Sequence, residues 1–492
     1  MAEARKSEQL SLRAVTSAPA DDLGARRTDE LVIALVGPIG SGCTKTGAEI
    51  KRLLEATFKY DKVFYFKVSD IIIEASKQIR KSVDIPAAGA ERALALQELG
   101  NELRQRFTNN YLAAKVIERI AAERVSNDGF DKAEDESLIP KPKRWCHIVD
   151  SIKNPAELSL LREVYGDMLW VIGVTAPEEV RRARLRDILR WEDAALSKAI
   201  HRDMTENFGH GQSVRDTFFQ SDCFIRNDGD NDERLKLAVL RHFEVVFGTP
   251  VRTPSTDESS MYAAHAAASR SACMSRQVGA ALVGINGEIL AVGWNDVPKF
   301  GGGLYSASDE AEDHRCYKWA NKVCHNDAHK SALYQEIFNA LKAANLLTDS
   351  ANLNEAIVAL KETDISQLIE YSRAVHAEMS ALISVARSNK PGIEGSTLYC
   401  TTFPCHSCAR HMVAAGVKKL VYIEPYPKSL ALELHRDAIS TGENNISNRL
   451  VLEQYEGIAP RNLLRLFKPA DLIRKKDGAI INFKPEIGRA HV

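Results

Sequence analysis

Short apolar runs and amphipathic helical patterns alternate through the first half of the chain. The first run, LVIALVG from Leu31, has the length of a strand and ends in glycine. Comparable runs at residues 63–66, in the HIVD segment ending at Asp150, and at residues 171–176 predict three further buried strands. Because helical patterns separate these runs, we expect crossover connections and a largely parallel sheet.

The second half predicts another α/β unit. Residues 248–260 contain two prolines and many small polar residues, a composition typical of a linker. A helix over residues 261–270 then precedes two strands joined at Asn286-Gly287, a dipeptide that strongly indicates a hairpin. The segment 296–371 is polar and then helical, and it interrupts the pattern as a long insertion. The two hairpin strands are predicted at 278–285 and 288–294. The remaining predicted elements are strands at 397–401 and 419–423, and helices beginning near His376 and Cys405.

These patterns predict an α/β protein of two domains. Residues 1–30 are rich in small and charged residues without a period, so we expect a mobile tail. Residues 31–247 make up the predicted parallel-sheet domain, in which the polar stretch 126–144 is a surface loop. Residues 261–492 form the predicted α/β/α domain with its insertion. A length of 492 residues agrees with two or three domains of ordinary size.

Composition and charge argue against several classes of protein. Hydrophobic residues make up 45% and charged residues 27% of the chain, and no uncharged run reaches the roughly 18 apolar residues of a membrane span. The net charge of −1 gives the whole chain no electrostatic reason to bind nucleic acid or an anionic membrane. The first residues lack the apolar core of a signal peptide, and nine scattered cysteines suggest no disulfide framework, so we expect a reducing cytoplasm.

Three side chains in the second half have the character of zinc ligands. They are His376 in the HAE motif, and Cys405 and Cys408 in the PCHSC motif. Cysteines three positions apart on the first turn of a helix project to one side, so both sulfurs can reach one ion at about 2.3 Å, with the imidazole nitrogen at about 2.0 Å. Three protein ligands leave a fourth position for water, whose pKa zinc lowers to about 7.

Glu378 lies two residues after this histidine and is the predicted group that moves protons in a hydrolysis. Positioned acid–base groups of this kind contribute about 10² to 10⁴ in rate. The order H-x-E and then P-C-x-x-C is the signature of the zinc nucleobase deaminases, and the match is complete. The alternative is a closed structural zinc site, which needs a fourth ligand. The nearest spare histidine, His406, is expected to face away from the two cysteines.

The segments around these motifs resemble the deoxycytidylate deaminase family. They are CMSRQVGAAL from Cys273, GWN ending at Asn295, and LYCTTFPCHSC, in the family's order. The resemblance implies a cytidine deaminase-like fold with a five-stranded sheet flanked by helices, a zinc ion, and deamination of a cytosine nucleotide. It also implies that Asn295 contacts the sugar and that the backbone at Ala377 helps to form the base pocket; a plain turn residue is the alternative for Asn295. The loop with Asp296 and three glycines departs from the family's short pattern and leaves the number of substrate phosphates open.

A second group of metal-ligating residue types lies in the insertion. Two thiols and two imidazoles would complete a tetrahedral structural zinc site and stabilise a segment with little core of its own. The spacing matches no standard zinc-finger pattern, and free cysteines are often buried as small hydrophobic residues. A second metal and ordinary buried side chains are both consistent with the sequence. The four residues are His314, Cys316, Cys324 and His325.

A glycine-rich loop, GPIGSGCT, follows the first predicted strand and opens a helix. This is the context of a P-loop, whose backbone N–H groups cradle phosphates, although a glycine turn without a ligand is the alternative. The standard pattern has lysine where this chain has Cys43, and Lys45 comes two positions late. Thr44 keeps the place of a magnesium ligand, so phosphate binding is better supported than phosphoryl transfer. The predicted nucleotide-binding residues are Gly37, Gly40, Ser41, Gly42, Cys43, Thr44, Lys45 and Asp150.

Several later segments of the first half resemble nucleoside monophosphate kinase-like P-loop proteins. In that family the acidic residue that ends a strand, here Asp150, lies near the phosphates, and lid arginines clamp them. With Cys43 in place of lysine, the resemblance favours a domain that binds a regulatory nucleotide, with Mg²⁺ as its companion ion, over an active kinase. The segments are SDIIIE, LQELGNELR, IVDSIKNP and the helix with Arg181, Arg182, Arg184 and Arg186.

Both halves together resemble the bacterial antiphage dCTP/dCMP deaminases, from Leu31 to about Phe467. This resemblance implies that the protein depletes deoxycytidine nucleotides during phage infection and that it forms homo-oligomers. It also implies that the deaminase activity is inhibited before infection, in some members by a small RNA. Three other functions stay open on the sequence: a single-stranded nucleic-acid deaminase, which would need a basic groove with aromatic side chains, a nucleotide-sensing module on a deaminase scaffold, and a bifunctional kinase–deaminase.

Overall fold

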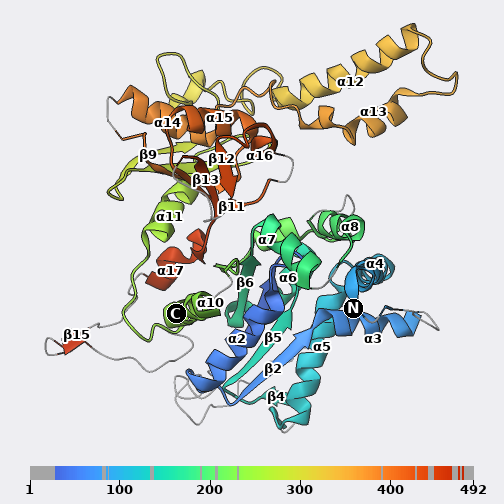
Figure 1. The fold of residues 1–492 in the computed structure, drawn as a ribbon, viewed down its shortest axis with the longest axis vertical. Helices are drawn as coiled ribbons and strands as arrows, with labels where there is room; N and C mark the ends of the chain where they lie inside the picture. The colour runs from blue at the N-terminus through green and yellow to red at the C-terminus, as the bar shows by residue number, and fades with distance from the viewer. Residues whose placement is uncertain are drawn as a thin grey trace, which may run out of the picture.

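The computed structural model describes twelve segments of the chain, and the predicted mobile tail lies almost entirely outside them. Within these segments, helices and strands form two six-stranded sheets, one centred on each half of the chain (Figure 1). No helix of the described segments has the length and apolarity that a bilayer crossing requires. The described residues are 28–79, 85–86, 88–132, 138–188, 191–204, 209–229, 232–388, 392–426, 429–441, 448–467, 475–476 and 479–480.

The first sheet contains the four strands predicted for the N-terminal half and two that were not predicted. Its strands are β1 (Leu31–Val36), β2 (Lys62–Lys67), β5 (Trp145–Asp150), β6 (Leu169–Thr175), β7 (Cys223–Arg226) and β14 (Gly457–Ile458). Their order is β14-β7-β6-β1-β5-β2, and all pairs are parallel except β14 with β7.

Helices cover both faces of this sheet. This arrangement explains why the sequence of β1 is a continuous apolar run. Val32, Ala34 and Val36 belong to one hydrophobic core, whereas Leu31, Ile33 and Leu35 belong to another. Successive side chains of a strand point to opposite faces, so both faces of β1 are buried. The helices of this half are α2 (Cys43–Ala56), α3 (Val68–Ile79), α4 (Gly89–Arg106), α5 (Tyr111–Ser126), α6 (Pro155–Tyr165), α7 (Glu178–Ala183), α8 (Asp193–Met204), α9 (Val214–Phe218) and α10 (Asp232–Phe247).

The second sheet has six strands, where the family resemblance implied five. They are β8 (Gly279–Val283), β9 (Ile289–Trp294), β10 (Thr397–Thr402), β11 (Lys419–Glu424), β12 (Ile439–Thr441) and β13 (Leu450–Gln454), in the order β12-β13-β11-β10-β8-β9. Strand β8 is antiparallel to both of its neighbours, and the other pairs are parallel. The helices here are α11 (Thr256–Ala268), α14 (Ala377–Arg387), α15 (His406–Ala414) and α16 (Ala431–Leu434).

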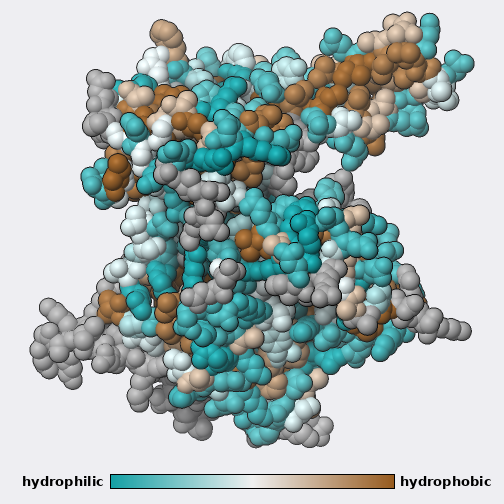
Figure 2. All heavy atoms as spheres, viewed as in Figure 1, coloured by the Kyte–Doolittle hydropathy of each residue, from teal (hydrophilic) through white to brown (hydrophobic). Residues whose placement is uncertain are grey.

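The insertion projects from the rest of the molecule as two helices (Figure 1). Only Tyr334 and Phe338 are buried on the longer helix, and no residue is buried on the shorter one. Figure 2 shows hydrophobic residues gathered along this projection. Its helices are α12 (His325–Ala343) and α13 (Leu353–Lys361), flanked by the 3₁₀ turns Ala307–Glu312 and Asp364–Gln367.

The structure corrects three boundaries. Helix α11 begins at Thr256, so the second part of the predicted linker is helical. The predicted loop 126–144 contains a two-stranded ribbon of β3 (Phe130–Lys132) and β4 (Leu138–Pro140). Most important, the chain beyond β13 leaves the second sheet: β14 joins the first sheet, and α17 (Leu463–Phe467) contacts α10 and α11. A further ribbon pairs β15 (Lys475–Lys476) with β16 (Ala479–Ile480).

Candidate functional site

The three predicted zinc ligands lie together at the N-termini of two helices. His376 is the N-cap of α14, Cys405 is the N-cap of α15, and Cys408 lies on the first turn of α15. Nδ1 of His376 is 3.4 Å from each of the two sulfurs. Ligands bonded to one tetrahedral zinc at about 2.0 and 2.3 Å are about 3.5 Å apart, so the spacing fits this metal. Within the described segments, these residues form the only such group of His, Cys, Asp and Glu side chains.

The electrostatics of the site favour a thiolate at Cys405, whereas the hydrogen bond with Cys405 and burial raise the pKa of the Cys408 thiol. Hydrogen bonds with Cys408 and, against the effect of burial, with His376 lower the pKa of Cys405 to about 4. The N-terminus of α15 adds partial positive charge from unpaired backbone N–H groups. The thiolate is the form of cysteine that binds a metal. The donor set therefore fits zinc without a fourth protein ligand.

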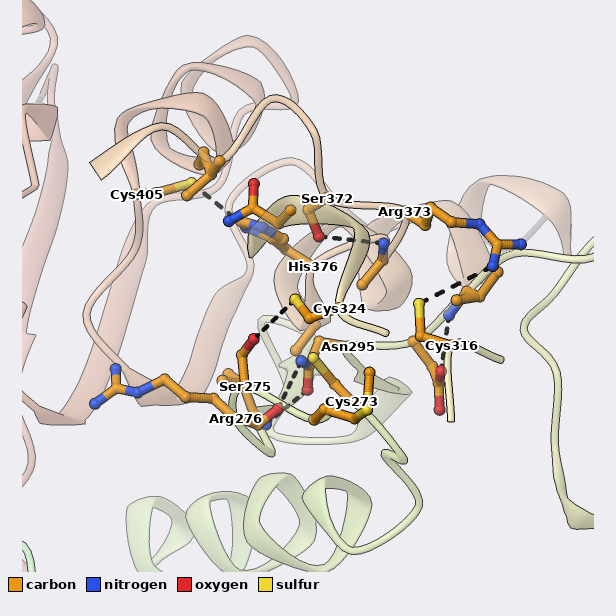
Figure 3. Close-up of a pocket in the computed structure, with 18 of the residues that line it drawn as sticks. Cys273, Ser275, Arg276, Asn295, Cys316, Cys324, Ser372, Arg373, His376 and Cys405 are labelled. Carbon is orange, nitrogen blue, oxygen red and sulfur yellow. Dashed lines mark hydrogen bonds between the residues drawn. The ribbon is translucent and has the colours of Figure 1, made fainter. Parts of the chain in front are cut away.

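Glu378 lies on the first turn of α14, beside the ligands. Its side chain is buried, with 4% of the residue exposed, and burial raises the pKa of its carboxyl group. Together with His376, Ala377, Cys405 and Asn295 it lines a cavity of about 230 Å³ (Figure 3). A carboxyl group with a raised pKa, close to the metal ligands, is suited to accept and return a proton.

Asn295 lies at the wall of this cavity, but its amide is engaged by the backbone. Its Oδ1 accepts a hydrogen bond from the N–H of Val278 at 2.7 Å, and its Nδ2 donates to the carbonyl of Arg276 at 2.8 Å. The side chain thus ties the end of β9 to the segment that leads into β8. The neighbouring Asp296 is buried and accepts from the N–H of Ala272 at 2.9 Å. Both residues fix the shape of the wall.

The comparisons with known proteins concern this part of the chain. Residues 254–424 match the model of the cytidine and deoxycytidylate deaminase zinc-binding region. This region is a domain of that deaminase family. The deoxycytidylate deaminase of Enterobacteria phage T2 is 47% identical over 55 residues, which cover 11% of this chain and 29% of the phage protein. The chain therefore aligns with less than a third of that relative's length.

Two further relatives extend the comparison. The deoxycytidylate deaminase of Saccharomyces cerevisiae is 29% identical over 279 residues, covering 55% of this chain and 72% of the yeast protein. A solved structure of the dCMP deaminase from cyanophage S-TIM5, in complex with dCMP and dUMP, is 23% identical and covers 42% of this chain and 99% of the phage chain, with a TM-score of 0.24.

The insertion of the deaminase domain does not form the predicted second metal site. Its four predicted ligands do not converge in the structure. Nδ1 of His314 lies 3.3 Å from the hydroxyl of Tyr305, and Sγ of Cys324 lies 3.6 Å from Oγ of Ser275. Cys316, Cys324 and His325 instead line the same cavity as Glu378. The spacing in the sequence gave no signal for this role, because it depends on how the insertion folds back.

The glycine-rich loop of the N-terminal half surrounds a larger cavity of about 750 Å³. Gly40 and Gly42 adopt φ values of 81° and 89°, which side-chain-bearing residues rarely tolerate. Asp150, at the end of β5, accepts a hydrogen bond from the hydroxyl of Thr44 at 2.7 Å and another from Tyr65 at 2.9 Å. The structure thus brings the predicted loop and the predicted carboxylate together.

One cation beside this loop, Lys153, was not among the site residues predicted from the sequence. Lys153 donates from Nζ to the carbonyl of Gly37 at 2.7 Å and pairs with Asp203 at 2.9 Å. Lys45 lines the cavity but pairs with Asp232 at 2.5 Å, near the start of α10. The only sequence signal for Lys153 was its place in the IVDSIKNP segment after β5. Its side chain lines the cavity together with the glycine-rich loop.

The four predicted lid arginines divide into two pairs. Arg181 donates to the carbonyl of Ile39 at 3.2 Å, and Arg184 lies 3.4 Å from the carbonyl of Gly40. The other two form ion pairs on the surface, Arg182 with Glu178 at 2.7 Å and Arg186 with Asp193 at 2.7 Å. Only the first pair is placed against the glycine-rich loop.

Proposed function

We propose that this protein is a zinc-dependent hydrolase that converts dCMP, dCTP or both to the deoxyuridine nucleotide and ammonia. The observation that carries this proposal is the convergence of His376, Cys405 and Cys408 beside the buried Glu378 in one cavity. The family of the domain and the names of its phage and yeast relatives support a cytosine nucleotide as substrate.

The chemistry follows from the groups around the cavity. When bound, zinc supplies a Lewis acid that lowers the pKa of water to about 7 and so provides a nucleophile at neutral pH. Glu378 takes a proton from the attacking water and delivers protons to the ring nitrogen and the departing amine. The C4–N bond breaks, ammonia leaves, and the oxygen of water becomes the carbonyl of uracil. Burial keeps bulk water away from Glu378.

Replacing Glu378 tests this assignment. We expect Glu378→Gln to retain zinc, because the three ligands are unchanged, and to lower kcat by at least about 10² to 10⁴-fold, because the amide cannot carry the proton. Ammonia release from dCMP and dCTP gives the rate, and elemental analysis gives the zinc content. The exposed Glu433, on α16, provides a control with Glu433→Gln. A Glu378→Gln protein with full turnover would rule out this mechanism.

We further propose that the N-terminal half binds a regulatory nucleotide, with Mg²⁺ near Thr44 and Asp150. The cavity around the glycine-rich loop supports this, as do the cations Lys153 and Arg184 at its wall. Cys43 at the lysine position argues for binding without phosphoryl transfer. Burial raises the pKa of the Cys43 thiol to about 11, so this side chain stays neutral and supplies no charge to a phosphate.

In the cell, we propose that the protein acts in the cytoplasm and depletes deoxycytidine nucleotides in antiphage defence, under the control of an inhibitor such as a small RNA. This context comes from the family resemblance. Homo-oligomer formation is part of the same proposal. It is supported by apolar side chains on the projecting insertion, where Leu346 is 71% and Val358 is 63% exposed.

A further inference from the structure

Two arginines line the cavity of the deaminase domain, and they lie at opposite sides of it in Figure 3. The guanidinium of Arg373 lies 4.0 Å from the ring centroid of Trp319 and donates to the carbonyl of His314 at 3.1 Å. These contacts hold Arg373 to the insertion. Arg276 instead pairs with the carboxylate of Glu424, and 39% of its side chain is exposed. Arg276 is therefore the cation of this wall that has room to turn.

Glu424 stands between Arg276 and the N-terminal half of the chain. It ends β11, and its side chain is 12% exposed. Nε of Arg215, on α9, lies 3.7 Å from the same carboxylate oxygen that Arg276 contacts. A buried carboxylate that loses its only cation is strongly destabilised. With Arg215 beside it, Glu424 keeps a positive partner when Arg276 turns away.

We propose that Arg276 binds the phosphate of the nucleotide substrate, and that Arg215 allows this by staying paired with Glu424. The inference rests on the proposed function, since its ligand is a cytosine nucleotide or the uracil product. Asn295 positions Arg276, because its amide holds the backbone at Arg276 and Val278. The guanidinium moves while the backbone beneath it stays fixed. A side chain of the N-terminal half thus contributes to the substrate specificity of the deaminase domain.

The test measures the dissociation constants of dUMP and deoxyuridine by calorimetry on the full zinc-loaded chain, together with KM and kcat for dCMP. Arg276→Ala should weaken dUMP binding about 10- to 100-fold and leave deoxyuridine binding unchanged, because one charge-assisted interaction with phosphate is lost. KM for dCMP should rise by a similar factor, with a smaller effect on kcat. Arg276→Lys should recover part of the affinity.

Two variants test the role of the shared carboxylate. Glu424→Gln should tighten dUMP binding, because Arg276 loses its competitor for the phosphate. Arg215→Ala should weaken dUMP binding, because Glu424 then retains Arg276. Arg436→Ala, an exposed arginine outside both cavities, is the matched control and should leave both affinities unchanged.

The outcomes separate this inference from the proposed function. Equal loss of dUMP and deoxyuridine binding in Arg276→Ala would indicate a merely structural role and overturn the inference. So would a loss confined to Arg373→Ala, or weaker dUMP binding in Glu424→Gln together with tighter dUMP binding in Arg215→Ala. Failure of the wild-type protein to release ammonia from any cytosine nucleotide would refute the proposed function instead, and the binding measurements on dUMP would still decide the role of Arg276.

Discussion

Gly293 determines how closely helix α14 approaches strand β9. A Cβ atom at this position would lie 2.3 Å from the carbonyl oxygen of Ala377 and 2.4 Å from the backbone nitrogen of Ala381. Both atoms belong to the helix that carries His376 at its cap and Glu378 on its first turn. The positions of a metal ligand and of the proton carrier therefore depend on the absence of a side chain in the strand below.

We expect Gly293→Ala to displace α14, lower the zinc content and reduce kcat by at least tenfold. Overpacking of this kind also costs about 1 to 3 kcal/mol of the free energy of unfolding. Elemental analysis, thermal unfolding and ammonia release measure the three effects. Gly209→Ala is the control, because among the described residues its Cβ would approach Asn109 alone, at an ordinary 3.4 Å. Normal zinc content and rate in Gly293→Ala would show that α14 tolerates the displacement.

The residues that the sequence could predict are those whose geometry is local. Cys405 and Cys408 lie three positions apart on one helix turn, and Glu378 follows His376 by two positions, so spacing alone indicated a shared site. The roles of Lys153, Arg276 and Glu424 depend on contacts between segments far apart in the chain. No periodicity in the sequence reports such contacts. For the same reason the sequence left two roles open for the cysteines and histidines of the insertion, a second metal site and ordinary buried side chains.

At the scale of elements, the start of α11 is a junction between the two halves. Ser255 and Glu258 form a capping box there. The carboxylate of Glu258 is fully buried, accepts a bidentate ion pair from Arg241 of α10, and accepts the N–H of Ile458 in β14 at 2.9 Å. Burial raises the pKa of Glu258, but these hydrogen bonds outweigh it and hold the pKa below its ordinary value.

The lowered pKa of Glu258 determines how the free energy of unfolding depends on pH. The ionised Glu258 stabilises the folded chain above its ordinary pKa of about 4.5, and this contribution is lost as the pH falls through the lower folded-state value. We expect Glu258→Gln to lower the free energy of unfolding at pH 7 by about 2 kcal/mol, because hydrogen bonds to a charged group are lost, and the difference from wild type to shrink below about pH 4.5. Urea unfolding at several pH values measures it. A difference that does not change with pH would contradict this account.

Whether a strand could be predicted from the sequence depended on its length and its burial. The strands buried on both faces, such as β1 and β6, are long apolar runs and were predicted within two residues. Strand β14 has two residues and exists only because β7 presents an edge to it. Such an element has no pattern of its own, so the return of the chain to the first sheet could not be predicted.

At the scale of the whole molecule, the two sheets are linked by more than one kind of contact. Arg226 of β7 forms an ion pair with Glu453 of β13, and the hydroxyl of Thr175 in β6 is hydrogen-bonded to Gln454. Nε of Arg215 in α9 lies 3.7 Å from the carboxylate of Glu424 in β11, and the N–H of Ser213, which precedes α9, donates to the carbonyl of Lys153 at 2.9 Å, beside the glycine-rich loop. Elements near both cavities therefore belong to the contacts between the two halves of the chain.

These links predict that zinc stabilises the whole chain, including the half that does not bind it. A metal at about 100 times its dissociation constant adds about 2.7 kcal/mol to the free energy of unfolding.

The tryptophans allow a local test, because Trp145, Trp170 and Trp191 lie in the N-terminal half, and Trp294 and Trp319 lie in the C-terminal half. In a Trp294→Phe, Trp319→Phe protein, fluorescence reports the N-terminal half alone. We expect a chelator to lower the unfolding midpoint of this signal by several degrees, in step with the loss of deaminase activity, because β14 cannot leave the first sheet independently. An unchanged midpoint, with activity already lost, would show that the two sheets unfold separately and that the junction transmits no stability.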